Sequence, residues 1–349
     1  CNALFHSALK IPPAQGTTQP MMPRLSPLRR GTAALIALCI LCTLLGGLML
    51  TTAQEVTPTP AIPADATPTI TPVPRPLPIS SQVVEAATVE FFFAEIPQGG
   101  TGLIYVKAAN LQGVQAVFLD HTSELWSVVG DGFYGFLSAS MEQTPRQYDL
   151  DLLLWYADGT RQSIQLPVTI SLGQFLRQDV NITGDKAYLV DPTIERAELA
   201  RLDGVFAPFT LEHFWGEQGF DLPIPGGELT SAFGAFRTFN GSMQSRHTGW
   251  DLKASLGQPI LAAADGKVAF TGTLEIRGGF VAVDHGYGVY STYSHFQQVH
   301  VTQGQSIVQG QVLGTVGATG RTSGPHFHWE IAVNGVFVDA AQFIGLWKP

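Results

Sequence analysis

The sequence predicts an all-β protein with two folded domains that follow an N-terminal membrane segment and a Pro/Thr-rich tether. The chain has 349 residues, which is enough for two domains of roughly 100–200 residues each. Short aromatic and β-branched segments separated by glycine-containing turns fill residues 81–172 and 226–345. Residues 31–50 carry no charge, and eight prolines lie within residues 54–80. Together these observations define the order of the parts along the chain.

Charge is unevenly distributed and argues against nucleic acid as a partner. The formal net charge is −9, from 19 Lys and Arg against 28 Asp and Glu. Residues 54–225 hold 21 acids and 8 bases, and residues 226–349 hold 7 of each. Beyond the N-terminus the sequence therefore has no basic patch of the kind that binds a phosphate backbone.

The uncharged run 31–50 has the length of a membrane span, because twenty helical residues measure about 30 Å. Three arginines directly precede it, so the positive-inside rule places the N-terminus in the cytoplasm and the rest of the chain outside. Residues 21–53 are interpreted either as a cleaved signal peptide or as an uncleaved membrane anchor. Residues 1–20 stay unassigned. The protein is thus expected to be extracytoplasmic, either membrane-anchored through 31–50 or secreted to the cell wall.

Residues 54–80 are predicted to form an extended tether. Proline fixes φ and removes backbone donors, so this stretch cannot pack as sheet or helix. Such a linker holds a folded domain away from the membrane surface. The chain's three cysteines are Cys1, Cys39 and Cys42, and a metal site farther along must therefore use His, Asp or Glu.

Residues 81–172 are predicted to form an accessory β-sandwich of immunoglobulin type without chemistry of its own. Short strands at intervals of about 8–12 residues are typical of such sandwiches, and no ionisable residues cluster here. Residues 173–225 are interpreted as a connector that contains a short amphipathic helix at 194–202. The expected strands are 89–93 (VEFFF), 103–106 (LIYV), 114–118 (VQAVF), 132–136 (GFYGF) and 148–152 (YDLDL).

The C-terminal domain, residues 226–345, is predicted to be antiparallel β with a tight hairpin turn at 334–335 (NG). Seven of the nine histidines lie beyond residue 200, and four of these fall in three short motifs. His285, which precedes the glycines of 286–288, is expected at a turn in a structural role. The three motifs are 247–251 (HTGWD), 293–295 (YSH) and 324–330 (GPHFHWE).

Strand geometry brings the motif side chains onto shared faces. Residues i, i+2 and i+4 of a strand point to one side, so His247 can face the same side as Asp251. By the same spacing, His326, His328 and Glu330 share a face. Two histidines and one aspartate leave one tetrahedral position open, the arrangement of catalytic zinc. The combination is more specific than either His-x-His or His-x₃-Asp alone.

Residues 227–343 resemble the LytM/lysostaphin-type zinc metallopeptidases of the bacterial cell wall. The sequence departs from the family pattern at few positions. Trp250 stands in place of an aliphatic residue, Trp329 stands in place of phenylalanine, and residues 322–323 read Thr-Ser instead of Ser-Thr. None of them removes a ligand or a proton-transfer group. The resemblance rests on five segments in order, namely 230–234 (TSAFG), 247–251, 263–268 (AADGKV), 293–295 and 323–330 (SGPHFHWE).

The resemblance implies a role for each motif side chain. His247, Asp251 and His328 would bind one Zn²⁺ per peptidase domain. His295 and His326 would be the catalytic pair. Glu330 is either an outer partner that orients a ligand imidazole or a surface carboxylate.

The function implied is hydrolysis of peptide bonds in the stem or cross-bridge of bacterial peptidoglycan by a zinc-bound water. The alternative, also from the family resemblance, is a non-catalytic adaptor that binds and activates other wall hydrolases. Adaptors of this type typically lack ligand residues, whereas all five positions are filled here. The expectation is therefore a metalloendopeptidase, with the adaptor as the alternative.

Overall fold

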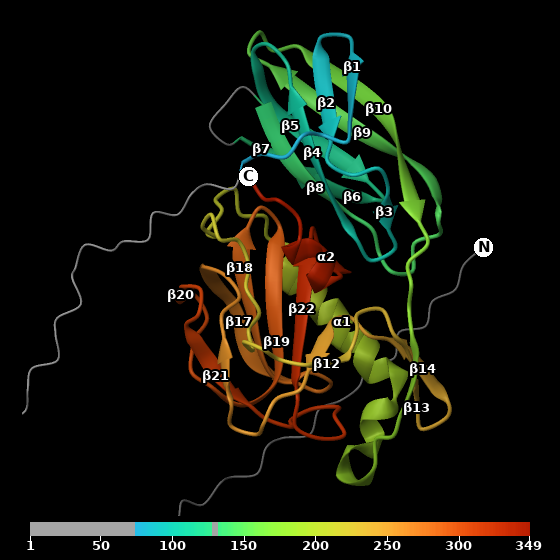
Figure 1. The fold of residues 1–349 in the computed structure, drawn as a ribbon, viewed down its shortest axis with the longest axis vertical. Helices are drawn as coiled ribbons and strands as arrows, with labels where there is room; N and C mark the ends of the chain where they lie inside the picture. The colour runs from blue at the N-terminus through green and yellow to red at the C-terminus, as the bar shows by residue number, and fades with distance from the viewer. Residues whose placement is uncertain (1–73, 128–131) are drawn as a thin grey trace, which may run out of the picture. The chain divides into compact units, whose positions relative to one another are not determined.

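The computed structural model describes residues 74–127 and 132–349. The predicted segments 1–20 and 21–53, and the tether up to residue 73, lie outside the described residues. Within the described ranges no helix is both long enough and apolar enough to cross a membrane. Strands dominate these ranges, which confirms the predicted all-β class (Figure 1).

Two five-stranded sheets fold between residues 80 and 171. Their strands are β1 (Ser80–Val84), β2 (Ala87–Phe91), β3 (Ile96–Pro97), β4 (Thr101–Lys107), β5 (Leu111–Phe118), β6 (His121–Glu124), β7 (Trp126–Ser127), β8 (Gly132–Ser138), β9 (Arg146–Tyr156) and β10 (Arg161–Ser171). One sheet has the order β1-β2-β4-β8-β7 and the other β3-β10-β9-β5-β6, and all pairs except β3–β10 are antiparallel. Both sheets contribute to one apolar core, in which Val89, Ile104 and Leu152 are fully buried.

Every strand predicted in this region overlaps an observed strand. The alternating segment 148–152 lies in β9, where buried Leu150, Leu152 and Leu154 alternate with partly exposed residues. Strand β10 was not among the expected strands. The classification of this sandwich as immunoglobulin type stays a prediction.

The segment expected to connect the two domains is itself packed into the structure. It contains β11 (Arg177–Val180), the 3₁₀ helix η1 (Gly184–Val190) and α1 (Pro192–Phe206). Strand β11 pairs in parallel with β13 (Phe236–Phe239), which pairs with β14 (Met243–Arg246). Helix α1 includes the predicted helix 194–202.

Helix α1 begins earlier than its amphipathic pattern indicates because two local signals favour an N-terminus there. Asp191 accepts a hydrogen bond from the backbone N–H of Thr193 at 2.8 Å, and Pro192 occupies the first helical position. The helix buries Glu198, Leu202 and Phe206, which lie four residues apart along one face. Leu202 and Phe206 pack with core residues of the C-terminal sheet.

The C-terminal domain is built around one large antiparallel sheet. Its elements are β12 (Leu229–Ser231), β15 (Trp250–Leu252), β16 (Pro259–Leu261), β17 (Gly266–Leu274), β18 (Gly278–Gly286), β19 (Val289–Val299), β20 (Ser306–Ile307), β21 (Val312–Val316), β22 (Phe327–Val333), β23 (Val336–Val338) and the short α2 (Ala340–Ile344). The main path is β12-β15-β22-β19-β18-β17-β20, with β22 and β19 near its middle (Figure 1). The predicted turn joins β22 to β23, and both Asn334 and Gly335 adopt positive φ there, at 52° and 79°. The hairpin prediction is confirmed.

Candidate metal centre

Sheet register brings the motif side chains together. On β15 and β22, Asp251 lies directly opposite His328, and on β19 Ser294 lies opposite His328 from the other side. Gly249 permits this close approach, since a Cβ atom there would lie 2.2 Å from the carbonyl oxygen of Trp329. The three predicted motifs therefore meet around β22.

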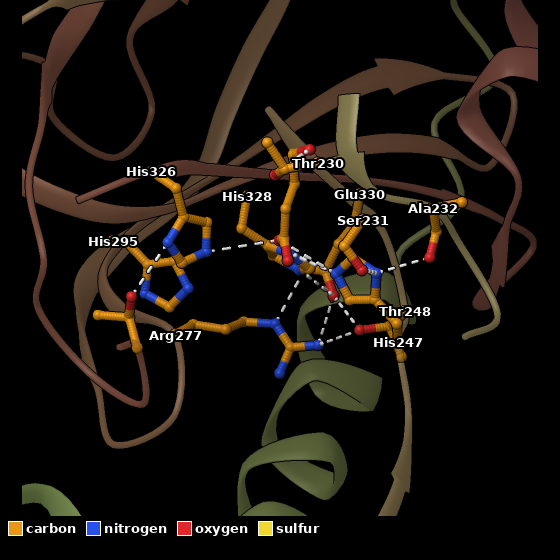
Figure 2. A network of polar contacts seen from close by, with 12 residues as sticks. Thr230, Ser231, Ala232, His247, Thr248, Arg277, His295, His326, His328 and Glu330 are labelled. Atoms are coloured by element: carbon orange, nitrogen blue, oxygen red, sulfur yellow. Dashed lines mark hydrogen bonds and ion pairs between the residues drawn. The ribbon is translucent and has the colours of Figure 1, made fainter. Parts of the chain in front are cut away.

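His247, Asp251 and His328 form one compact buried group. The Oδ1 atom of Asp251 lies 3.1 Å from His247 Nε2 and 2.8 Å from His328 Nδ1. The two imidazole nitrogens are 3.1 Å apart. Each residue offers one ligand atom, and these atoms lie within 4.8 Å of one another. Figure 2 shows both imidazoles pointing into the same small volume.

The hydrogen-bond partners of each imidazole indicate which ring nitrogen carries a proton when the ring is neutral. His247 Nδ1 lies 2.8 Å from the carbonyl oxygen of Ala232, which can only accept, so Nδ1 donates and Nε2 keeps its lone pair. His328 has a carboxylate oxygen at each ring nitrogen, Asp251 Oδ1 at 2.8 Å from Nδ1 and Glu330 Oε1 at 3.2 Å from Nε2. Donation from Nε2 to Glu330 would leave the lone pair of Nδ1 for a metal. In that form two imidazole lone pairs and the carboxylate of Asp251 converge, and a cation among them would stabilise the arrangement.

The pKa shifts differ among the three residues. Burial alone would lower the pKa of His328, but Glu330 and Asp251 raise it. Burial lowers the pKa of His247 to about 4, which keeps the imidazole neutral, as metal binding requires. Burial alone would raise the pKa of Asp251, but its histidine neighbours hold that pKa well below the usual range. Two imidazoles and one carboxylate are a donor set that suits a divalent transition metal and leaves a coordination position open.

His295 and His326 lie together beside these donors. Their ring centroids are 4.7 Å apart, and His326 Nε2 lies 3.5 Å from Asp251 Oδ1. His295 Nδ1 is 2.7 Å from the carbonyl oxygen of Thr319, and His326 Nδ1 is 3.0 Å from that of Gly324. Because both Nδ1 atoms face carbonyl acceptors, both Nε2 atoms can present a lone pair.

The backbone and burial of His295 mark it as a constrained residue. Its φ is 62°, in the left-handed region that non-glycine residues rarely adopt. Burial, together with the neighbouring His326 and His328, holds the pKa of His295 well below its usual range. His295 is therefore neutral near pH 7.

Glu330 is fully buried and belongs to the outer layer of the site, not to the surface. Its oxygens accept hydrogen bonds from the hydroxyls of Thr248 and Thr292, both at 2.5 Å, and from the guanidinium of Arg277. Burial alone would raise the pKa of Glu330, but the charges of Arg277 and His328 hold it well below the usual range. The carboxylate is thus ionised and oriented toward His328.

Sequence reasoning did not identify the residues behind Asp251. The guanidinium of Arg237 binds Asp251 Oδ2 and donates to Ser231 Oγ at 2.8 Å. Ser231 donates in turn to Gln178 on β11 at 2.7 Å. An arginine fourteen positions before an aspartate is not a recognised sequence pattern. The contact between Arg237 and Asp251 therefore becomes apparent only in the structure, where β13 pairs with β11.

A groove of 610 Å³ leads to His295 and His326. One wall is the segment 178–182, which includes most of β11, and another is the segment 321–326. Arg237, Lys253 and Arg321 line it together with Asp179 and Asp251. Each of the three cations is ion-paired, with Asp251, Glu228 and Glu195 respectively. The arrangement places an open groove with paired charges beside the candidate metal ligands.

His285 is not at a turn, and that prediction is wrong. It is fully buried within β18, where Nδ1 donates to the carbonyl oxygen of Asp265 at 2.7 Å and Nε2 bonds Ser291 Oγ at 2.7 Å. The strand continues to Gly286, which pairs with Val289 of β19. Its role is structural, as expected.

Comparisons with known proteins point to one family. Residues 245–340 match the model of Peptidase family M23. The Peptidoglycan DD-endopeptidase ShyC of Vibrio cholerae serotype O1 is 41% identical over 90 residues, which are 26% of this chain and 21% of that protein. The Lipoprotein NlpD/LppB homolog of Pseudomonas aeruginosa is 34% identical over 123 residues, which are 35% of this chain and 41% of that protein. In both cases the match spans well under two thirds of the relative.

A solved structure gives a wider match. A crystal structure from Pseudomonas aeruginosa assigned to peptidase M23 superposes with a TM-score of 0.53 and 26% identity. The superposition covers 73% of this chain and 96% of that one, so the similarity extends well beyond residues 245–340.

Proposed function

Because residues 245–340 form a domain of peptidase family M23, we propose that this protein is a zinc-dependent endopeptidase that hydrolyses peptide bonds of bacterial peptidoglycan. One observation carries the proposal above the others: His247, Asp251 and His328 each offer one ligand atom within 4.8 Å of the others, and the imidazoles of His295 and His326 lie beside them. The donor types are those of catalytic zinc sites that keep one position open.

Zn²⁺ would be held by His247 Nε2, Asp251 Oδ1 and His328 Nδ1, and when bound it would polarise the scissile carbonyl and lower the pKa of a water to about 7. His326 Nε2 accepts the proton of the attacking water and later gives it to the leaving amine. His295 Nε2 accepts a second hydrogen bond from that water and aligns it. Because His295 is neutral, with its Nδ1 proton engaged by Thr319, this role fits better than donation to an oxyanion.

The substrate class is proposed from the relatives. The Vibrio cholerae relative is named as a peptidoglycan DD-endopeptidase. Peptidoglycan lies outside the cytoplasmic membrane, which agrees with the topology predicted from the uncharged run 31–50. We therefore propose that the folded part acts in the cell wall, on a tether at the membrane or after secretion.

The proposal is tested with the full chain, loaded with one equivalent of zinc and incubated with purified peptidoglycan. Mass analysis of the released fragments should show newly cleaved peptide bonds, and the His328→Ala variant should release none. If the zinc-loaded chain cleaves no bond but accelerates another wall hydrolase, the protein is an adaptor and the enzymatic proposal is wrong.

A further inference from the structure

Three charged side chains form a buried chain that runs from helix α1 to the candidate metal centre. Glu198 on α1, Arg277 just before β18 and Glu330 on β22 are 5%, 4% and 0% exposed. Buried charges are costly unless each is paired and hydrogen-bonded. The hydrogen bonds among these three side chains therefore show which part of the site each of them holds in position.

Glu198 holds the backbone and the side chain of the Arg277 segment together. Its Oε2 accepts from the backbone N–H of Ile276 at 2.7 Å. Its Oε1 accepts from Arg277 twice, from the backbone N–H at 3.2 Å and from Nη1 at 2.9 Å. One carboxylate thus sets both the position of the loop before β18 and the direction of the guanidinium.

Arg277 passes this constraint to Glu330 through a two-point contact. Its Nε donates to Oε2 at 2.9 Å and its Nη2 donates to Oε1 at 2.6 Å. A planar guanidinium that binds both oxygens of a carboxylate fixes its rotation as well as its position. Glu330 Oε1 is the atom that faces His328 Nε2 at 3.2 Å, and Figure 2 shows Arg277 reaching toward Glu330 from below the metal-facing histidines.

We propose that Glu198 is a positioning residue for the metal centre: through Arg277 and Glu330 it sets the ring orientation of His328, so that helix α1 is a working part of the site. The inference rests on the proposed function only in taking His328 as a metal ligand. Helix α1 (Pro192–Phe206) lies outside the residues that match the peptidase family, 245–340.

The chemistry of a Glu198→Gln substitution makes the proposal testable. Glutamine keeps the shape but replaces one acceptor oxygen by an NH₂ group. Since every partner of the carboxylate is a donor, either the N–H of Ile276 or the guanidinium of Arg277 would then face another donor. In the first case the backbone of the Ile276–Arg277 segment shifts, and in the second the guanidinium does, so that either way the contact of Arg277 with Glu330 is displaced.

The experiment compares full-length variants loaded with zinc or with cobalt. Glu198→Gln should weaken zinc affinity, measured by competition with a chelator, by about 10–100-fold, the usual effect of losing an outer partner of a ligand histidine. The visible spectrum of the Co²⁺-loaded variant should shift, because it reports the ligand geometry. Leu202→Ala is the matched control, since Leu202 is buried on the same helix and packs only in an apolar cluster. It should lower the unfolding midpoint while leaving zinc affinity and the cobalt spectrum unchanged.

A double-mutant cycle tests whether Glu198 acts on the metal centre through Glu330. If Glu198 acts through Glu330, its substitution should have little further effect on zinc affinity in a Glu330→Gln background. If Glu198→Gln does not fold, Arg277→Lys replaces it in the same measurements. This variant keeps the charge but loses the two-point contact, so it should weaken zinc affinity and shift the cobalt spectrum. The proposal is overturned if Glu198→Gln leaves zinc affinity and the cobalt spectrum unchanged, if Leu202→Ala weakens zinc affinity equally, or if the two substitutions act additively. None of these readouts uses peptidoglycan, so failure of the proposed hydrolysis would be seen separately.

Discussion

Substitutions of His328 in β22 and of His326, which directly precedes that strand, are expected to have different effects. His328 offers Nδ1 to the group of three acceptors, whereas His326 is outside that group and lies 3.5 Å from Asp251 Oδ1 through its Nε2. His326→Ala should therefore keep one zinc per chain and lose turnover. His328→Ala should lose both, because only His247 and Asp251 would hold the metal.

The magnitudes follow from the assigned roles. A positioned general base contributes about 10²–10⁴-fold to a rate, which is about 3–5 kcal/mol of barrier, and His326→Ala should lose that much in kcat. Its zinc affinity should stay within about threefold. His328→Ala should lose more zinc affinity than the about 10–100-fold caused by loss of an outer partner.

The assay measures metal content by elemental analysis and release of peptides from peptidoglycan on the same preparations. His300→Ala is the control, because His300 is an exposed histidine outside the site, and it should match the parent chain in both measurements. The reasoning is refuted if His326→Ala loses zinc while His328→Ala retains it, or if both variants remain active.

Three further predictions concern residues of the C-terminal domain that lie outside the proposed metal ligands and catalytic histidines. Gly249→Ala should destabilise the fold by about 1–3 kcal/mol and weaken zinc binding, because its Cβ would meet the Trp329 carbonyl; an unchanged urea midpoint would contradict this. Tyr293→Phe should cost about 1–3 kcal/mol in thermal unfolding, since the buried N–H of Ala263 loses its acceptor; a neutral result would show that the bond contributes nothing. Burial lowers the pKa of His285 from 6.5 to about 4, so the unfolded chain binds this proton first as pH falls. The unfolding free energy of the metal-free chain should therefore drop by about 2 kcal/mol from this group between pH 7 and pH 5, and urea titrations of His285→Gln should lack that part of the drop.

Much of the fold was predictable because its signals are local. Alternating burial on β9 and the Asn334-Gly335 turn each depend on neighbouring residues alone. Strand spacing places His328 and Glu330 on one side of β22. His326 precedes that strand and His247 lies between β14 and β15, so the prediction that His247 and Asp251 share a strand face is wrong, because the chain leaves the sheet at 247–249. The meeting of His328 with Asp251 required the register between β15 and β22, which the family resemblance supplied and residue spacing did not.

The outer layer of the site was not predictable from the sequence because it depends on long-range contacts. Glu198 lies 79 residues before Arg277, and nothing in an amphipathic helix pattern indicates that one of its acids is buried. The support of Asp251 by Arg237 likewise depends on a strand pairing formed by the connector. His285 was misplaced because adjacent glycines indicate a turn, whereas β18 runs through His285 to Gly286 and the turn follows at 287–288.

The most direct test of the central claim is the zinc X-ray absorption spectrum of the full chain carrying one equivalent of metal. The account predicts a first shell of nitrogen and oxygen at about 2.0–2.2 Å, with outer scattering from two imidazoles, those of His247 and His328, and with no sulfur. A sulfur shell at about 2.3 Å would place the metal on the N-terminal cysteines and would contradict the assignment of His247, Asp251 and His328 as the zinc ligands.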